Sequence, residues 1–130
     1  MTQYLVRSIM RADPPTLTAE TPIRRAVAAL VDAKSPAAPV LGDDGRLIGI
    51  LTQKDCFRPA LHASYHREWT GRVADHMSRE VVSVEAGDEV IRVAEMFLDQ
   101  PHRVFPVLDG ARVVGLLRRS DVLALLTRIG

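Results

Sequence analysis

Apolar residues recur at the spacing of an α-helix in two stretches of the chain. Within each stretch they occupy positions i, i+3, i+4, i+7 and i+8, which fall on one face of a helix. The second set follows the first by 67 residues at every position. The two sets are Ile23, Ala26, Val27, Leu30 and Val31, then Val90, Val93, Ala94, Phe97 and Leu98. This pattern predicts two amphipathic helices and an internal repeat.

Short apolar runs that are typical of strands flank each predicted helix. The runs are residues 16–18, 39–41 and 46–51 in the first repeat, and residues 81–84, 106–108 and 112–117 in the second. Glycine- and aspartate-containing turns separate the last two runs of each repeat, which predicts a β-hairpin in each. A second helix is expected to begin near residues 52–55 and 118–121. The first start reads as a capping box with Thr52 as cap, whereas Ser120 is the candidate cap of the second.

These elements predict an α/β (α+β) fold built from two pseudo-symmetric β-α-β-β-α repeats, residues 1–60 and 73–130. Each repeat alone would expose an apolar face of a three-stranded sheet, so we expect the two sheets to pack together. Short helical segments at residues 6–10 and 73–77 precede the repeats. Residues 61–72 are expected to be a helical insert or linker. The helical segment itself is expected to run from Pro59 to Trp69, because Pro59 suits a first helical turn and Leu61, Tyr65 and Trp69 share one face.

Composition limits the classes of protein that fit this pattern. The formal net charge of +1 provides no overall field for recruiting nucleic acid or an acidic membrane. Cys56 is the single cysteine, which excludes an internal disulfide and a multi-thiolate metal site. The sequence has no signal pattern and no apolar run of about 20 residues, the length needed to span a bilayer. We therefore expect a cytoplasmic protein without membrane or nucleic-acid partners.

The repeat, the order of its elements and two related strings resemble a tandem pair of cystathionine β-synthase (CBS) domains. The strings are residues 49–55 (GILTQKD) and residues 115–121 (GLLRRSD). The resemblance implies a stand-alone regulatory module that is not an enzyme and requires no cofactor. It also implies a homodimer and an adenosine-containing effector, such as AMP, ADP, ATP or S-adenosylmethionine, bound in clefts between the repeats.

Asp55 and Asp121 end these two strings and are the candidate ribose-binding residues. A carboxylate accepts hydrogen bonds at two oxygens, which suits the paired hydroxyl groups of a ribose. Each aspartate also lies where it would support a helix N-terminus, so the capping role remains an alternative. The position of both residues in the family motif favours ribose binding.

Candidate phosphate contacts are concentrated in the second repeat. Thr52 and Ser120 lie at helix starts, where hydroxyl and backbone N–H groups bind anions. For Thr52 the capping role is the stronger interpretation. His102 and Arg103 resemble a His-Arg pair that lies near the nucleotide phosphates in this family. Arg118 replaces the hydroxyl residue that the family usually has at the start of this helix. Solvated surface arginines are the alternative to a site built from these cations.

The first repeat has a serine and a proline, Ser35 and Pro36, where the second has this basic pair, and only Lys54 is nearby. The Asp121 site is therefore the preferred one. The resemblance also implies contacts from the other repeat to each site. These are Pro15, Thr16, Lys34 and Ser35 for the Asp121 site, and Val81, Val82 and His102 for the Asp55 site.

Other groups of residues carry weaker signals. His62 and His66 lie one helical turn apart but have no defined third ligand, so no metal site is expected. The sequence has neither a nucleotide-hydrolase phosphate loop nor a dinucleotide fingerprint. Two functions remain: a ligand-sensing module that acts on an unknown protein partner, and a protein-interaction scaffold with vestigial clefts. For the scaffold, the insert containing Tyr65 and Trp69 would be the binding surface.

Overall fold

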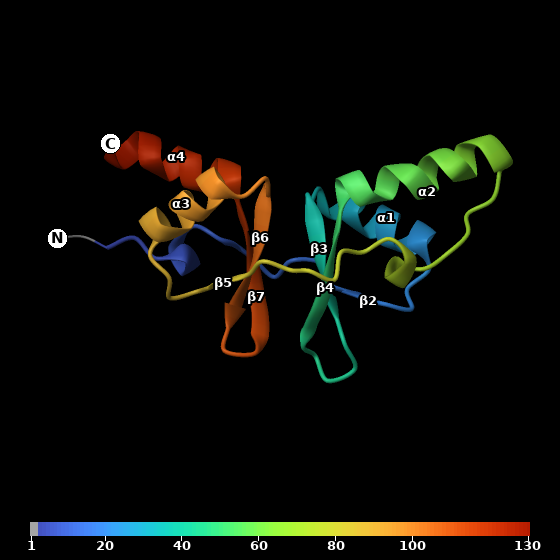
Figure 1. Ribbon diagram of the computed structural model, residues 1–130, viewed down its shortest axis with the longest axis horizontal. Coiled ribbons are helices and arrows are strands. Elements are labelled where there is room, and N and C mark those ends of the chain that lie inside the picture. Colours follow the sequence, from blue (N-terminus) through green and yellow to red (C-terminus); the bar gives the residue numbers. More distant parts are fainter. Residues whose placement is uncertain (1–2) are drawn as a thin grey trace. The chain divides into compact units, whose positions relative to one another are not determined.

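The computed structural model describes residues 3–130, which form two sheets and four α-helices. The chain falls into two compact units. The middle unit is Pro15–Val81, and the terminal unit joins Met1–Pro14 to Val82–Gly130. Each unit contains one copy of the predicted order of strand, helix, strand, strand and helix (Figure 1). The mixed α/β class and the repeat are thus confirmed.

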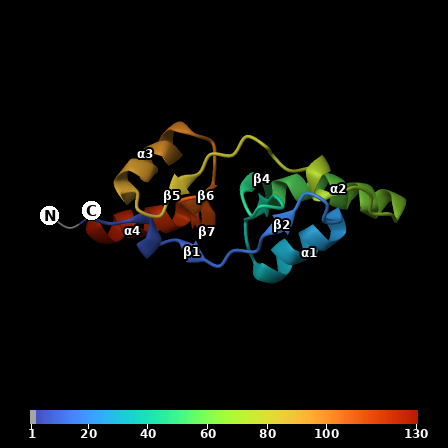
Figure 2. The same ribbon diagram turned by 90° about the horizontal axis from the view of Figure 1, so that it is seen from below.

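The middle unit has a sheet of order β2-β3-β4, in which β2 is parallel and β4 antiparallel to β3. Both of its α-helices lie on the same face of this sheet (Figure 1, Figure 2). Its elements are β2 (Leu17–Thr18), α1 (Ile23–Ala33), β3 (Ala37–Leu41), β4 (Leu47–Thr52), α2 (Gln53–His66) and the short 3₁₀ helix η2 (Val73–Asp75).

The terminal unit has a four-stranded sheet of order β1-β7-β6-β5, and its two α-helices also lie on one face (Figure 2). Its elements are the 3₁₀ helix η1 (Val6–Ser8), β1 (Arg11–Ala12), β5 (Val84–Glu85), α3 (Val90–Asp99), β6 (Val104–Asp109), β7 (Arg112–Arg118) and α4 (Arg119–Ile129). The prediction of three strands is wrong here, because β1 from the N-terminal segment pairs antiparallel with β7.

The segments that precede the two repeats therefore pack on different units from the repeats they lead. Val6 lies in the core of the terminal unit, and its N–H donates to the Asp88 carbonyl at 2.9 Å. Val73 lies in the core of the middle unit, and its N–H donates to the Thr21 carbonyl at 2.9 Å. Repeats of sequence and units of packing thus divide the chain at different residues.

The two predicted helix stripes form most of the helical contribution to the cores. Ile23, Ala26 and Leu30 are buried in the middle unit, and their counterparts Val90, Val93 and Phe97 are buried in the terminal unit. The last members of the stripes are exceptions, because Val31 is 63% exposed and Leu98 is 85% exposed. Successive residues turn by about 100° around a helix, which places these positions at the edge of the stripe.

The predicted insert helix is not a separate element. Helix α2 runs from Gln53 to His66 without interruption and contains Pro59 in its interior, so the prediction that Pro59 begins a helix is wrong. The Pro59 ring is buried, and the helix lacks one N–H donor at this position. Trp69 lies beyond the helix end and packs against the core of the middle unit instead of sharing a helix face with Tyr65.

None of the helices described over residues 3–130 is both long enough and apolar enough to cross a membrane.

Candidate ligand-binding site

Asp121 lies in the first turn of α4 and is held by Arg118, the residue at the N-cap position of this helix. The guanidinium forms a two-pronged contact, in which Nε donates to Oδ2 at 2.9 Å and Nη2 donates to Oδ1 at 2.7 Å. Arg11 of β1 also lies near this carboxylate, with its Nη2 3.7 Å from Oδ1. The Asp121 side chain is 15% exposed, whereas that of Arg118 is 30% exposed. The carboxylate is thus mostly buried and lies near two arginines.

This environment favours the charged form of both partners. The hydrogen bond from Arg118 lowers the pKa of Asp121, and this effect exceeds the opposing effect of burial. The same hydrogen bond raises the pKa of Arg118. At neutral pH the pair is therefore an ion pair with two charge-assisted hydrogen bonds.

The other predicted residues of the terminal unit are located near the start of α4. The backbone N–H of Arg119 donates to the Arg103 carbonyl at 2.8 Å, which joins the His102–Arg103 segment to this helix. The Arg103 side chain is exposed, and His102 is partly buried. Nδ1 of His102 is itself buried and has no hydrogen-bond partner among the described residues.

Ser120 does not cap the helix. Helix α4 begins at Arg119, two residues earlier than a Ser120 cap requires, so Ser120 lies inside the first turn and is exposed. The prediction of a Ser120 cap is therefore wrong. No side chain supplies a capping hydrogen bond at Arg118, whose guanidinium contacts the Asp121 carboxylate instead.

The corresponding position of the middle unit has different chemistry. Thr52 and Asp55 form the predicted capping box, in which the Asp55 N–H donates to Thr52 Oγ1 at 3.2 Å and the Thr52 N–H donates to Asp55 Oδ2 at 2.9 Å. The Gln53 N–H donates to the Pro36 carbonyl at 2.9 Å, which mirrors the bond between Arg119 and Arg103. Lys54 is exposed and forms no ion pair among residues 3–130.

The residues around Asp121 thus come together within the terminal unit, and those around Asp55 come together within the middle unit. Pro15, Thr16, Lys34 and Ser35, predicted to serve the Asp121 site, belong to the middle unit, whereas Asp121 belongs to the terminal unit. Likewise, Val81 belongs to the middle unit with Asp55, and Val82 belongs to the terminal unit. Assignments that join residues of different units remain predictions.

Ser35 and Lys34 have structural roles within the middle unit. Ser35 is buried, and its hydroxyl donates to the Ala37 carbonyl at 2.6 Å. The Gln53 amide donates to the Ser35 carbonyl at 2.8 Å, a contact that sequence reasoning missed. Lys34 ends α1 in a left-handed conformation with φ of 50°. Pro15 is partly buried and Thr16 is exposed.

Arg11 was also missed by sequence reasoning. Its neighbour across the sheet is Leu116, and this pairing of β1 with β7 brings Arg11 to Asp121. The two residues are far apart in the chain, so no local pattern could have linked them.

A polar cavity of about 590 Å³ lies beside Asp121 in the terminal unit. Its walls come from the segment around η1 and β1 and from one side of α4. They are formed by Ser8, Ile9, Met10, Arg11, Asp121, Ala124, Thr127 and Arg128. Two of these wall residues, Arg11 and Arg128, thus add positive charge to the cavity walls, and Arg11 is the one that lies near the Asp121 carboxylate.

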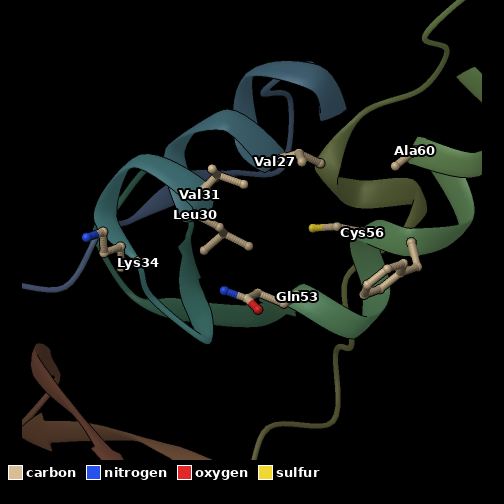
Figure 3. Close-up of a pocket in the computed structure, with 8 residues that line it drawn as sticks. Val27, Leu30, Val31, Lys34, Gln53, Cys56 and Ala60 are labelled. Carbon is tan, nitrogen blue, oxygen red and sulfur yellow. The ribbon is translucent and has the colours of Figure 1, made fainter. Parts of the chain in front are cut away.

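The middle unit has a cavity of about 400 Å³ with mostly apolar walls between α1 and α2. Leu30 and Cys56 face each other across it (Figure 3). Of the predicted ligand-binding residues, only Lys34 lines this cavity, so the cavity does not coincide with the capping box of Asp55.

Burial raises the pKa of the Cys56 thiol to about 11, and the Asp55 charge adds to this effect. The thiol is therefore protonated at neutral pH and is a poor nucleophile. His62 and His66 approach with ring centroids 4.4 Å apart. Over the described residues, no group of three or more His, Cys, Asp or Glu side chains is placed to hold a metal ion.

Comparison with known families agrees with the repeat. The family model described as "CBS domain" matches twice, over residues 6–61 and 73–128. The chain belongs to the CBS domain family. Both matched segments contain one copy of the aspartate-ending string, so Asp55 and Asp121 occupy equivalent positions of the two CBS domains.

Curated relatives of this CBS pair include the uncharacterized protein MJ1225 of Methanocaldococcus jannaschii, which is 27% identical over 93% of this chain. YlbB of Bacillus subtilis, also uncharacterized, is 25% identical over 90% of this chain and 78% of its own length. The chain spans 42% of MJ1225 and 24% of a second uncharacterized protein of the same archaeon, MJ1404. The match thus covers only part of these two relatives.

Two solved CBS pairs share the fold over almost their whole length. The CBS domain pair of protein MJ0100, solved with 5′-methylthioadenosine and S-adenosyl-L-methionine, matches with a TM-score of 0.84 and 24% identity. The match covers 99% of this chain and 100% of that one. CBSX2 of Arabidopsis thaliana, solved with AMP, matches with a TM-score of 0.80 and 23% identity over 97% and 98% of the chains. At these identities the likeness establishes the fold.

Proposed function

We propose that this CBS pair is a regulatory module that binds an adenosine-containing ligand at Asp121 and has no catalytic role. The observation that carries the proposal is the mostly buried Asp121 carboxylate, held at the start of α4 among Arg118, Arg11 and the backbone of Arg103. A carboxylate suits a ribose, and the surrounding cations suit a phosphate. The solved relatives, which contain AMP or adenosyl compounds, support this ligand class.

His102 adds support for a polar ligand on this side of the terminal unit. Its Nδ1 is buried without a partner among the described residues, and buried polar atoms usually have one. A ligand phosphate or hydroxyl would supply that partner. Ser120, exposed in the first turn of α4, presents a hydroxyl on the same helix start.

The Asp55 position is proposed as a secondary site for the same ligand class, with Thr52, Lys54, Val81 and Val82 as contacts. Ser35 and Pro36 occupy the place of the basic pair, as the matching backbone bond to Gln53 indicates. We therefore expect weaker binding of phosphate-bearing ligands at this position.

Isothermal titration calorimetry with AMP, ADP, ATP and S-adenosylmethionine tests the proposal. Asp121→Ala should weaken binding of the preferred ligand by at least about tenfold, since it removes the hydrogen-bond acceptors for the ribose. Asp109→Ala is the matched control, because Asp109 is exposed in the β6–β7 hairpin, away from α4. Equal affinity for the Asp121 and Asp109 variants, with both folded, would contradict the assignment.

The bound state must then be read by another protein, which the CBS pair regulates. A ligand shifts a conformational equilibrium only by its difference in affinity for the two conformations. We propose that ligand binding at Asp121 changes the packing around α4 and that the partner senses this change.

We also propose that the protein forms a homodimer through its helical faces. Exposed apolar residues recur at matching positions of the two repeats, Val31 with Leu98 and Phe57 with Leu123. A two-fold dimer requires a self-complementary surface, and a repeated apolar face suits this geometry. Phe57→Glu and Leu123→Glu should reduce the mass measured by light scattering to that of a monomer, whereas Ala111→Glu in the β6–β7 hairpin should not. A monomeric wild-type protein would contradict the proposal.

The alternative function is a protein-interaction scaffold. The exposed Leu61 and Tyr65 on α2 favour it, because they are large apolar side chains without a contact in the core. This alternative predicts that none of the adenosyl ligands binds, and the titration above therefore discriminates between the two functions.

A further inference from the structure

Arg118 and Thr52 occupy equivalent capping positions in the two units but treat the following aspartate differently. Thr52 binds Asp55 through its backbone N–H, which uses only Oδ2 of the carboxylate. Arg118 binds Asp121 through Nε and Nη2, which uses both carboxylate oxygens. The acceptor atoms proposed for the ribose are thus already engaged at Asp121, whereas Asp55 has one oxygen without a hydrogen bond among the described residues.

A ribose that binds to Asp121 must compete with Arg118. Hydroxyl groups are neutral donors, and their hydrogen bonds to a carboxylate are weaker than the paired bonds from a guanidinium. A nucleoside without a phosphate therefore has nothing to exchange for the ion pair that it disrupts. A nucleotide can compensate for the loss of this ion pair, because its phosphate can accept hydrogen bonds from the same two N–H groups of Arg118 in the same planar geometry.

We propose that Arg118 is a selectivity residue of the Asp121 site, which admits adenosine ligands that carry a phosphate and rejects those that do not. This inference rests on the proposed function. On binding, the guanidinium exchanges the Asp121 carboxylate for the ligand phosphate, and the released carboxylate accepts the ribose hydroxyls. Adenosine and 5′-methylthioadenosine lack the anion and are excluded.

The burial of the pair strengthens this selection. Asp121 has a mostly buried side chain, so its released oxygens need new donors at once. Arg11 lies 3.7 Å from Oδ1 and is largely exposed, so it does not replace Arg118 as a two-pronged donor. Discrimination between adenosine ligands with and without a phosphate therefore depends on Arg118 and not on the general positive charge of the site.

Calorimetric titration of the full chain with AMP and with adenosine tests the inference, because the two ligands differ only by the phosphate. Every protein compared, the reference called wild-type included, carries Asp55→Ala, so that the proposed secondary site does not contribute to the measured binding. We expect the wild-type protein to prefer AMP by at least about 30-fold, and Arg118→Thr to reduce this ratio below about threefold. Much of the change should come from tighter adenosine binding, since a threonine at this position would recreate the cap found at Thr52. Circular dichroism establishes that the variant is folded, and Arg118→Gln serves in its place if it is not.

Arg119→Thr is the matched control. It removes the same charge from the adjacent residue, whose side chain forms no ion pair among residues 3–130. The ratio for AMP and adenosine should remain at the wild-type value. The double variant Arg118→Thr with Asp121→Ala should lose the adenosine binding that Arg118→Thr gains, which locates the effect at Asp121.

The outcomes separate the inference from the proposed function. Wild-type protein that binds AMP and adenosine equally well overturns the role of Arg118 and leaves the proposed function intact. The role is also overturned if Arg118→Thr weakens AMP binding without strengthening that of adenosine, because Arg118 is then an ordinary phosphate contact. If neither ligand nor any other adenosyl compound binds the wild-type protein, both the proposed function and the inference are wrong.

Discussion

Replacing Gly115 by alanine should destabilise the terminal unit by preventing the close approach of β1 to β7. A Cβ atom at this position would lie 2.7 Å from Met10 Sδ and 2.8 Å from the Arg11 carbonyl oxygen. Ordinary contacts of a Cβ atom with other heavy atoms are 3.4–4 Å. The Met10 side chain can move, but the Arg11 carbonyl belongs to the backbone that pairs with β7. The strand must therefore shift by roughly 0.6 Å or more to restore ordinary contacts.

The expected magnitude follows from two opposing effects. Overpacking typically destabilises by about 1–3 kcal/mol, and a backbone clash places Gly115→Ala near the upper end. Alanine also lowers the entropy of the unfolded chain, which returns about 0.4–1 kcal/mol. We therefore expect the free energy of unfolding to fall by about 2 kcal/mol and the melting temperature to fall by roughly 6–10 °C.

Urea denaturation of the wild-type protein and of Gly115→Ala measures this change in the free energy of unfolding. The comparison requires that the dependence of this free energy on urea concentration is the same for both proteins. Gly87→Ala is the control, because a Cβ atom there would meet only the far end of the Arg7 side chain at 3.2 Å. Hydrogen exchange should also show reduced protection of the backbone N–H groups of residues 6–12 in the Gly115 variant. A loss below about 0.5 kcal/mol, the usual range of surface substitutions, would refute the reasoning.

Three further predictions concern stability and reactivity. The lowered pKa of Asp121 contributes stability that is present above the pKa of an unfolded aspartate and is lost as the pH falls through the lower pKa of the folded state. In Asp121→Asn, the free energy of unfolding should therefore fall less steeply as the pH is lowered. An unchanged dependence on acidic pH would contradict the ion pair. Thr52→Ala should destabilise by about 1 kcal/mol through loss of the α2 cap, whereas the exposed Thr70→Ala should be neutral in urea titrations. Because its pKa is raised to about 11, the Cys56 thiol should react with a disulfide reagent at pH 8 only after denaturant is added, and rapid labelling of the native protein would contradict its burial.

Local patterns were sufficient to predict most of the secondary structure. The apolar stripes at Ile23 and Val90 begin the helices that the structure contains, and both hairpins occur at the expected turns. The capping box of Thr52 and Asp55 was also predictable, since it involves residues three positions apart. Pro59 shows the limit of this reasoning. Proline is favoured at a helix start and disfavoured in a helix interior, so local reasoning did not place Pro59 inside α2.

The candidate site was predictable in part. The position of Asp121 followed from the repeated string, and the basic residues near it followed from comparing the repeats. The paired hydrogen bonds from Arg118 were not predicted, because a long side chain can point to solvent or to a neighbour from the same backbone position. The role of Ser120 as a cap failed for a smaller reason, since the helix begins two residues earlier than that cap requires.

By itself, the sequence determined the helices and strands, because these depend on residue spacing within a short stretch. It also determined the repeat and the family, because the same short patterns occur twice along the chain. Tertiary structure alone decided which unit each leading segment joins, as the pairing of Arg11 with Leu116 illustrates. It also decided that Arg11 and Arg118 meet on one carboxylate. Strand pairing and ion pairing between distant residues depend on the backbone geometry of the whole unit, in which Gly115 allows β1 to approach β7. Local spacing carries no information about that approach.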